Sequence, residues 1–174
     1  MLNPTASRNL VRLTYVLIAA LTFIADQVTK GMIERRIGMF EVVPVIPHFF
    51  NLTRSQNPGA AFGMFADSPA PWKTVLLVIV SALLIGSVLA VVWRSHRLDW
   101  KSGAGLALIL GGAMSNLLDR IRFGEVVDFL DVYYHGYHWY TFNVADAAIV
   151  MGAFFLILRV GFSSETPQLA AAKR

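Results

Sequence analysis

Long runs of apolar residues are the feature that most restricts how this chain can fold. Residues 72–93 contain a single charged side chain, Lys73, and have a tryptophan at each end. About 18 or more consecutive apolar residues predict a transmembrane helix, and aromatic residues flanking such a run are typical of membrane–water interfaces. Of the 174 residues, 56% are hydrophobic and only 15% are charged. The sequence therefore predicts one integral-membrane domain over residues 1–174.

The apolar segments predict a bundle of four transmembrane helices. The first apolar run, residues 13–25, follows Arg8 and Arg12, and by itself it could be interpreted as a cleavable signal peptide. No convincing small-residue cleavage site follows, and the helical pattern continues through Asp26 toward Ile33, so we interpret it as a retained span. We expect the polar tail at residues 163–174 to be disordered. The four predicted spans are residues 11–33, 72–93, 102–121 and 141–160.

The segments between these spans include regions that resemble β-strands. β-Branched and aromatic residues are frequent in residues 40–47, 49–54 and 122–140, and prolines interrupt the first of these. Residues 60–65 could form a short helix after the Asn57-Pro58-Gly59 turn. The predicted fold class is a mainly α membrane protein with four transmembrane helices, a small β region and a short loop helix.

Basic residues indicate which way the bundle is inserted. Four antiparallel spans place both termini on one side of the membrane. Arg8, Arg12 and the short basic loop at residues 94–101 lie on that side. The opposite side carries nearly as many basic residues, but the positive-inside rule gives most weight to short loops. We therefore expect both termini to be cytoplasmic.

Polar residues that are unusual in apolar helices all fall at the same ends of the predicted spans. In an up-down bundle, every one of these positions lies at the outer side of the membrane. Ionisable groups cost roughly 2.5–3.5 kcal/mol each near the bilayer centre on insertion scales, so they are usually functional or paired. These residues are Asp26, Lys30, Asn57, Asn116, Asp119, Arg120, Asn143 and Asp146.

The third span carries two stripes of small and polar residues. The first contains Gly112, Asn116 and Arg120, and the second contains Gly111, Ser115 and Asp119. Small residues allow close helix packing in lipid, which explains the glycines and Ser115 without any chemistry. Asn116 and Arg120 could instead bind a peptide carbonyl group or neutralise a carboxylate. In the first span, Asp26 and Lys30 are one turn apart, and an ion pair between them could simply lower the cost of insertion.

Two aspartates outside these stripes are the candidates for chemistry. Asp128 follows a strand-like run, and Asp146 lies in the first helical turn of the fourth span, where the helix dipole favours an anion. Two neighbouring carboxylates share a proton, so one can accept a proton from water while the other donates one. From spacing alone this pattern fits a peptidase, a proton-coupled carrier or a purely structural pairing. A serine–lysine pair of Ser115 and Lys30 is disfavoured because Ser115 lies in no nucleophile motif.

Several other function classes lack support in the sequence. The absence of cysteine excludes disulfides, thiol nucleophiles and Cys-based metal sites. The four histidines do not have metal-ligand spacing with a third ligand, so we expect no metal site. The net charge of +4 is spread along the chain and forms no basic patch interleaved with aromatic residues. We therefore expect contact with membrane lipid and no nucleic-acid partner.

At the polar residues the sequence resembles the bacterial lipoprotein signal peptidases, the signal peptidase II family. Five motifs carry the resemblance, and they occur in the expected order at the expected span ends. One departure is Ser115, where the family usually has glycine, a small-for-small change. The motifs are Asp26-Gln27-Val28-Thr29-Lys30, Asn57-Pro58-Gly59-Ala60-Ala61-Phe62-Gly63, Gly111 to Arg120, Glu125-Val126-Val127-Asp128-Phe129 and Phe142-Asn143-Val144-Ala145-Asp146.

The resemblance implies an aspartic endopeptidase of the bacterial inner membrane, with four transmembrane helices and a small periplasmic β-cradle. The implied substrate is a prolipoprotein that carries diacylglycerol on a cysteine, and cleavage falls immediately before that cysteine. Asp128 and Asp146 would be the catalytic pair, near the periplasmic face. We expect a monomer in which residues 60–68 could act as a lid. The implied supporting residues are Asp26, Lys30, Asn57, Asn116, Asp119, Arg120 and Asn143.

Overall fold

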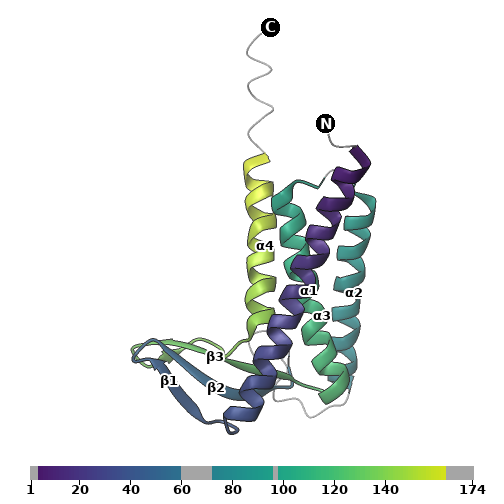
Figure 1. Cartoon of the computed structure of the whole chain (residues 1–174). Coiled ribbons are helices and arrows are strands. Elements are labelled where there is room, and N and C mark those ends of the chain that lie inside the picture. The colour runs from purple at the N-terminus through teal and green to yellow at the C-terminus, as the bar shows by residue number, and fades with distance from the viewer. Residues whose placement is uncertain (1–3, 60–71, 96–97, 164–174) are drawn as a thin grey trace.

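The computed structural model describes residues 4–59, 72–95 and 98–163. Within them, four helices lie side by side and a small sheet projects from one end of the bundle (Figure 1). The predicted loop helix and lid at residues 60–68, and the tail beyond Ser163, lie outside the described residues. The helices are α1 (Pro4–Arg36), α2 (Trp72–Arg94), α3 (Trp100–Phe123) and α4 (Val144–Ser163).

The helix boundaries differ from those of the predicted spans by at most three residues, except at the start of α1. Helix α1 begins at Pro4 rather than at residue 11. Helix α4 begins at Val144 rather than at residue 141, because Asn143 forms its cap. Among the described residues, α1, α2 and α3 are long and apolar enough to cross a membrane. Four spans were predicted, and three of the described helices meet this criterion. That α4 also crosses the membrane stays a prediction.

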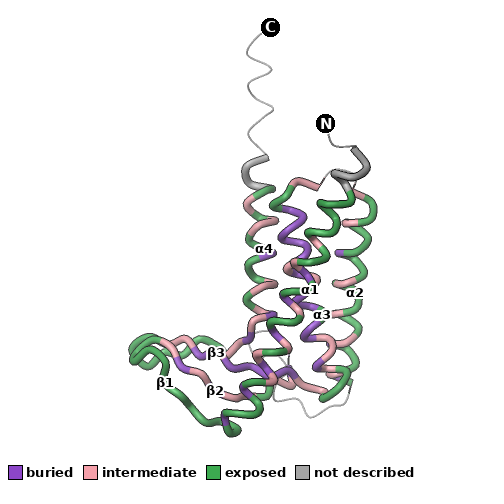
Figure 2. Tube along the Cα trace, in the orientation of Figure 1, coloured by how far each residue is buried: buried purple, intermediate pink, exposed green. Residues whose placement is uncertain are grey.

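Helix α3 is the centre of the bundle. It packs against α1, α2 and α4, and the buried residues are concentrated along it (Figure 2). The outward faces of α1 and α2 expose large apolar side chains, such as Leu21 and Leu83, each 65% exposed. Such extensive apolar exposure would be unfavourable in water but matches a hydrocarbon environment. The bundle therefore combines a polar and small-residue centre with an apolar exterior.

Glycines let the helices approach closely. A Cβ added at Gly112 would lie 2.5 Å from the carbonyl oxygen of Ala145 on α4, and one at Gly105 would lie 2.8 Å from that of Gly152. A Cβ on Gly111 would collide with the carbonyl oxygen of Ala19 on α1. Close backbone approach through small residues is the typical packing mode of helices in lipid. The packing role predicted for Gly111 and Gly112 is confirmed.

The strand-like segments form a four-stranded antiparallel sheet in the order β1-β2-β3-β4. Helix α3 ends at Gly124, whose φ of 78° is left-handed, and the chain turns directly into β3. A register shift between Leu52 and Ser55 precedes the end of β2, where Ser55 lies opposite Asp128. The strands are β1 (Val42–Ile46), β2 (Phe50–Asn57), β3 (Val126–Tyr134) and β4 (Tyr137–His138).

Two clusters hold the sheet in place. Phe129 of β3 packs with Ile33 and Ile37 at the end of α1, which fixes the sheet to the bundle. Farther along β3, the buried carboxylate of Asp131 accepts a hydrogen bond of 2.8 Å from the Asn51 amide. It also contacts His138 Nδ1 at 2.8 Å, which links β2, β3 and β4. Both clusters restrict the position of the strand that carries Asp128.

The glycine contact between α3 and α4 predicts a large effect of a small substitution. Gly152→Ala should lower the free energy of unfolding by about 1–3 kcal/mol, because the new methyl group would collide with the backbone of Gly105. Gly86→Ala is the matched control, since a Cβ at Gly86 meets nothing within 4 Å. It should be neutral or stabilising by up to about 1 kcal/mol through helix propensity. Thermal unfolding in detergent measures both, and equal effects would contradict the close packing.

Candidate active site

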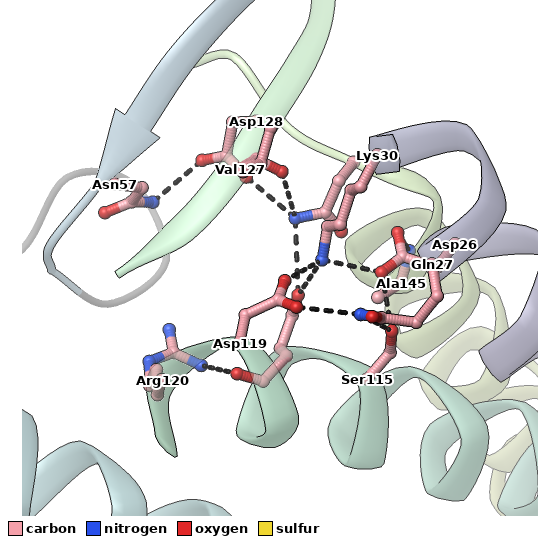
Figure 3. Close-up of polar contacts among 12 residues, drawn as sticks. Asp26, Gln27, Lys30, Asn57, Ser115, Asp119, Arg120, Val127, Asp128 and Ala145 are labelled. Atoms are coloured by element: carbon pink, nitrogen blue, oxygen red, sulfur yellow. Dashed lines mark hydrogen bonds and ion pairs between the residues drawn. The ribbon is translucent and has the colours of Figure 1, made fainter. Parts of the chain in front are cut away.

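The structure brings the predicted polar residues together at the sheet end of the bundle, from five separate elements, and Figure 3 shows part of this network. The end of strand β2 contributes Asn57. Helix α1 contributes an acid and a lysine, and α3 contributes an amide, an acid and an arginine. Strand β3 contributes one aspartate, and the start of α4 contributes an asparagine and the second aspartate. The predicted convergence at one end of the bundle is therefore confirmed as geometry.

Asp26 connects three helices through one buried carboxylate. It is fully buried, and its Oδ1 accepts a hydrogen bond of 2.8 Å from the backbone N–H of Ala145 in the first turn of α4. Its Oδ2 accepts one of 2.7 Å from the Ser115 hydroxyl on α3. An anion at a helix N-terminus satisfies free N–H groups and interacts favourably with the helix dipole. Asp26 thereby fixes where α4 begins relative to α1 and α3.

Lys30 is buried and surrounded by acceptors. Its Nζ lies 2.6 Å from Asp26 Oδ2 and 2.6 Å from Asp119 Oδ2, and it donates to Asn116 Oδ1 at 2.9 Å. Three acceptors match the three donors of an ammonium group. Removing one partner of a buried ion pair leaves an uncompensated charge, so these contacts depend on one another. The predicted pairing of Asp26 with Lys30 is confirmed, and it extends to Asp119.

Asn143 caps α4 through a reciprocal capping box. Its side-chain Oδ1 accepts a hydrogen bond of 2.9 Å from the Asp146 N–H. The Asp146 Oδ2 in turn accepts one of 3.3 Å from the Asn143 N–H. This is the arrangement in which the cap residue and the third helical residue satisfy each other's backbone donors. The local sequence Asn-Val-Ala-Asp thus sets both the start of the helix and the orientation of Asp146.

The same asparagine links the two candidate carboxylates. Asn143 Nδ2 donates a hydrogen bond of 2.7 Å to Asp128 Oδ1. Asp128 Oδ2 accepts a second one of 2.9 Å from Asn57 Nδ2, and Asp146 Oδ1 accepts one of 2.8 Å from Asn116 Nδ2. Asp128 is only 3% exposed, whereas Asp146 is partly exposed. Both carboxylates thus accept a hydrogen bond from Asn143, but Asp128 is buried and Asp146 is partly exposed.

Burial changes the acidity of Asp128. Desolvation raises the pKa of its carboxyl group from 3.8 to about 7, and the nearby charge of Asp146 acts in the same direction. Hydrogen bonds from Asn57 and Asn143 act against this shift by favouring the ionised form. Neighbouring acids in unlike environments are the usual arrangement for acid–base catalysis near neutral pH. Asp128 can therefore exchange a proton in the physiological range.

Arg120 fixes the turn that follows β2. Its Nη2 donates a hydrogen bond of 3.2 Å to the Gly59 carbonyl, and its Nη1 donates one of 3.4 Å to the Asn116 carbonyl. In that turn, the Gly59 N–H donates to Asn57 Oδ1 at 2.9 Å, so the amide of Asn57 is oriented toward Asp128. Arg120 thus supports the position of Asn57 through contacts with backbone carbonyl groups.

Two further residues belong to the network that the sequence did not predict as site residues. Ser115 was predicted to serve packing, which is incomplete: it is fully buried, and its hydroxyl also donates to Asp26. Gln27 Nε2 donates to Ser115 Oγ at 2.9 Å and to Asp119 Oδ1 at 2.7 Å. Ser115 lies one turn before Asp119 on the same face of α3, and this spacing was the sequence feature that could have indicated its place in the network. Because the Ser115 hydroxyl donates to Asp26 while Lys30 is held by two carboxylates, the pair is not arranged as nucleophile and base.

The network predicts a structural rather than catalytic effect at Ser115. Ser115→Ala removes one donor from buried Asp26 and should lower the free energy of unfolding by about 1–3 kcal/mol. The activity of the site should stay within a few fold of that of the parent protein. Ser87→Ala is the control, because Ser87 lies on α2 and its exposed hydroxyl donates within its own helix, to Leu83. Loss of activity in a folded Ser115→Ala protein would contradict this assignment.

Comparison with known proteins agrees with this geometry. Residues 18–162 match the family model described as Signal peptidase (SPase) II. A lipoprotein signal peptidase of Solibacter usitatus is 46% identical over 141 residues, covering 81% of this chain and 86% of the relative. A lipoprotein signal peptidase of Syntrophotalea carbinolica is 45% identical over 144 residues, covering 82% of this chain and 88% of the relative.

The fold matches as well. A solved structure described as a bacterial membrane enzyme superposes with a TM-score of 0.81 at 29% identity, covering 89% of this chain and 92% of the other. The region matched by the family model contains all the elements that form the polar network. The chain therefore belongs to the signal peptidase II family of membrane peptidases.

Proposed function

We propose that this signal peptidase is an aspartic endopeptidase in which Asp128 and Asp146 form the catalytic dyad. Family membership supplies the coarse activity, which is the removal of signal peptides from prolipoproteins. The observation that carries the finer proposal is that Asn143 contacts both carboxylates while their burial differs. The proposed substrate is a diacylglyceryl-modified prolipoprotein, cut immediately before the lipidated cysteine.

The proposed reaction divides acid and base roles between the two aspartates. Ionised Asp146, which is partly exposed, accepts a proton from a water molecule as the water oxygen attacks the carbonyl carbon of the scissile peptide bond. Protonated Asp128, whose pKa is about 7, hydrogen-bonds the carbonyl oxygen and supplies the proton to the departing amine nitrogen. The C–N bond breaks, and the proton held by Asp146 restores the dyad. This chemistry requires no metal or organic cofactor.

The remaining polar residues are proposed to hold the dyad in place. Asn57 and Asn143 hold Asp128, and Asn116 holds Asp146. Preorganised donors of this kind contribute a few kcal/mol each in other enzymes, because they need no reorganisation during the reaction. The buried group of Asp26, Lys30 and Asp119 fixes the helices that carry those asparagines. Arg120 fixes the turn at Asn57.

The proposed membrane placement follows from the fold. Helix α4 would be the fourth span, since it lies alongside the others and exposes apolar side chains such as Val150 and Ile157 (Figure 1). The start of α1 and the end of α4 lie at the bundle end away from the sheet, which we assign to the cytoplasm. The dyad then lies near the periplasmic face of a bacterial inner membrane. We propose that a monomer takes its lipid-anchored substrate from the bilayer.

Isosteric substitution tests the dyad. Asp128→Asn and Asp146→Asn should each lower the cleavage rate of a lipidated prolipoprotein by at least about a thousandfold, because neither amide can exchange the required proton. Each variant should remain folded in the membrane. Glu34→Gln is the matched control, because this exposed carboxylate lies near the same end of the bundle on α1, and it should retain activity within a few fold. Near-normal turnover in either dyad variant would end the proposal.

The acidity of Asp128 predicts a pH limit on activity. Because its carboxyl group must be protonated, kcat/KM should fall as pH rises through about 7. The folded form binds this proton more tightly than the unfolded chain, so ionisation of Asp128 should also lower stability as pH rises between about 4 and 7. Asp128→Asn should therefore be more thermostable than the parent at pH 8 and similar at pH 4. A pH-independent difference would contradict this assignment.

A further inference from the structure

A groove lies at the bundle end opposite the polar site. Helices α1 and α2 both pack chiefly on α3, so the space between them has α3 as its floor. The ring of Tyr15 lies directly over Gly103 of that floor, and Ala107, one turn later on α3, presents only a methyl group to the groove. Tyr15 of α1 and Val92 of α2 line its walls. The cavity has a volume of about 210 Å³.

The groove suits a hydrocarbon chain. Apart from Arg12 and the tyrosine hydroxyl group, its lining is apolar. An apolar cavity of roughly 150 Å³ takes up benzene, so a larger one in a membrane protein can hold part of an acyl chain. The groove is open along one side and lies between helices whose outer faces carry exposed apolar residues. A lipid chain can therefore enter it sideways from the bilayer.

The charge around the groove indicates the headgroup. Arg12 lines the groove and is exposed, and exposed Arg94 follows the lining residue Trp93. In the described part of the chain, Asp99 is the acidic residue of this bundle end. It is already engaged, because it pairs with Arg159 and caps α3 through the Lys101 and Ser102 N–H groups. The local field is thus positive, which favours a phosphate group.

The position of Trp93 places the headgroup at the right depth. Trp93 is 85% exposed and lies at the end of α2, where tryptophan is typical of the membrane–water interface. Arg12 lines the same cavity as Trp93, and the lining residues Val16 and Leu110 lie farther along their helices, away from this end of the bundle. A long arginine side chain near a helix end can extend its charged group to the membrane interface. An arginine can bind a phosphate through two parallel N–H donors.

We propose that the α1–α2–α3 groove is a binding site for one anionic phospholipid, with an acyl chain between Ala107 and Val92 and the phosphate held by Arg12. This site lies at the other end of the bundle from the dyad, so its occupant is a membrane lipid rather than the substrate. The bound chain fills the gap between α1 and α2. Binding to the folded protein alone therefore stabilises the bundle.

Titration of the purified full-length protein in neutral detergent with phosphatidylglycerol or phosphatidylcholine tests the site. Native mass spectrometry gives the dissociation constant, and thermal unfolding gives the stabilisation. Wild-type protein should bind phosphatidylglycerol at least tenfold more tightly than phosphatidylcholine. Arg12→Gln should reduce this preference to less than threefold. Arg36→Gln, on an exposed arginine at the other end of α1, is the charge control and should retain it.

A second variant tests the acyl-chain part separately. Ala107→Leu fills the groove and should weaken binding of both lipids at least tenfold, whereas Ala20→Leu on the exposed face of α1 should not. Prolipoprotein cleavage reports whether each variant is folded. Equal binding by Arg12→Gln and Arg36→Gln would overturn the proposal, as would unchanged phosphatidylglycerol binding in folded Ala107→Leu. If the variants changed only the fraction of dimer and left lipid binding unchanged, the groove would be an interface with a second copy of the chain. That result would also overturn the proposal.

Discussion

The arrangement of this enzyme depends on one buried ionic contact, that of Lys30 with Asp26 and Asp119. Each of the three groups would be costly to bury alone, and together they satisfy one another. Asp26 also accepts a hydrogen bond from the Ala145 N–H, so the contact fixes the start of α4 relative to α1 and α3. Because Asp146 lies in the first turn of α4, the ionic contact positions a proposed catalytic group that it does not touch.

Asn143 combines a structural and a chemical task in one side chain. Its oxygen caps α4, and its amide nitrogen donates to Asp128. The capping box holds Asp146 in a fixed orientation, so the cap that starts the helix also sets the geometry of the proposed dyad. Burial makes the Asp128 carboxyl group costly to ionise and so raises its pKa to about 7. A pKa near neutral suits this group to proton transfer.

The two ends of the bundle solve different problems. At the sheet end, hydrogen bonds and ion pairs join α1, α3, α4 and β3 into one network. At the opposite end, α1 and α2 are separated by a groove, and the proposed phospholipid would take the place of side-chain contacts between them. Between the two ends, glycines hold α3 close to α1 and α4. The membrane is thus proposed to be a structural component at one end and the source of substrate at the other.

Local composition determined the apolar helices, the strand-like segments and the positions of the polar residues, because hydrophobic runs and turn residues act over short distances. The five motifs, in their order along the chain, indicated the family without the structure. Only the tertiary structure decided which atoms meet: that Asp26 caps a helix 119 residues away, and that Ser115 and Gln27 belong to the network. Such contacts join residues that are distant in the chain. A small polar side chain such as that of Ser115 can serve either helix packing or hydrogen bonding. Its neighbours in space, which sequence spacing alone does not specify, select between the two.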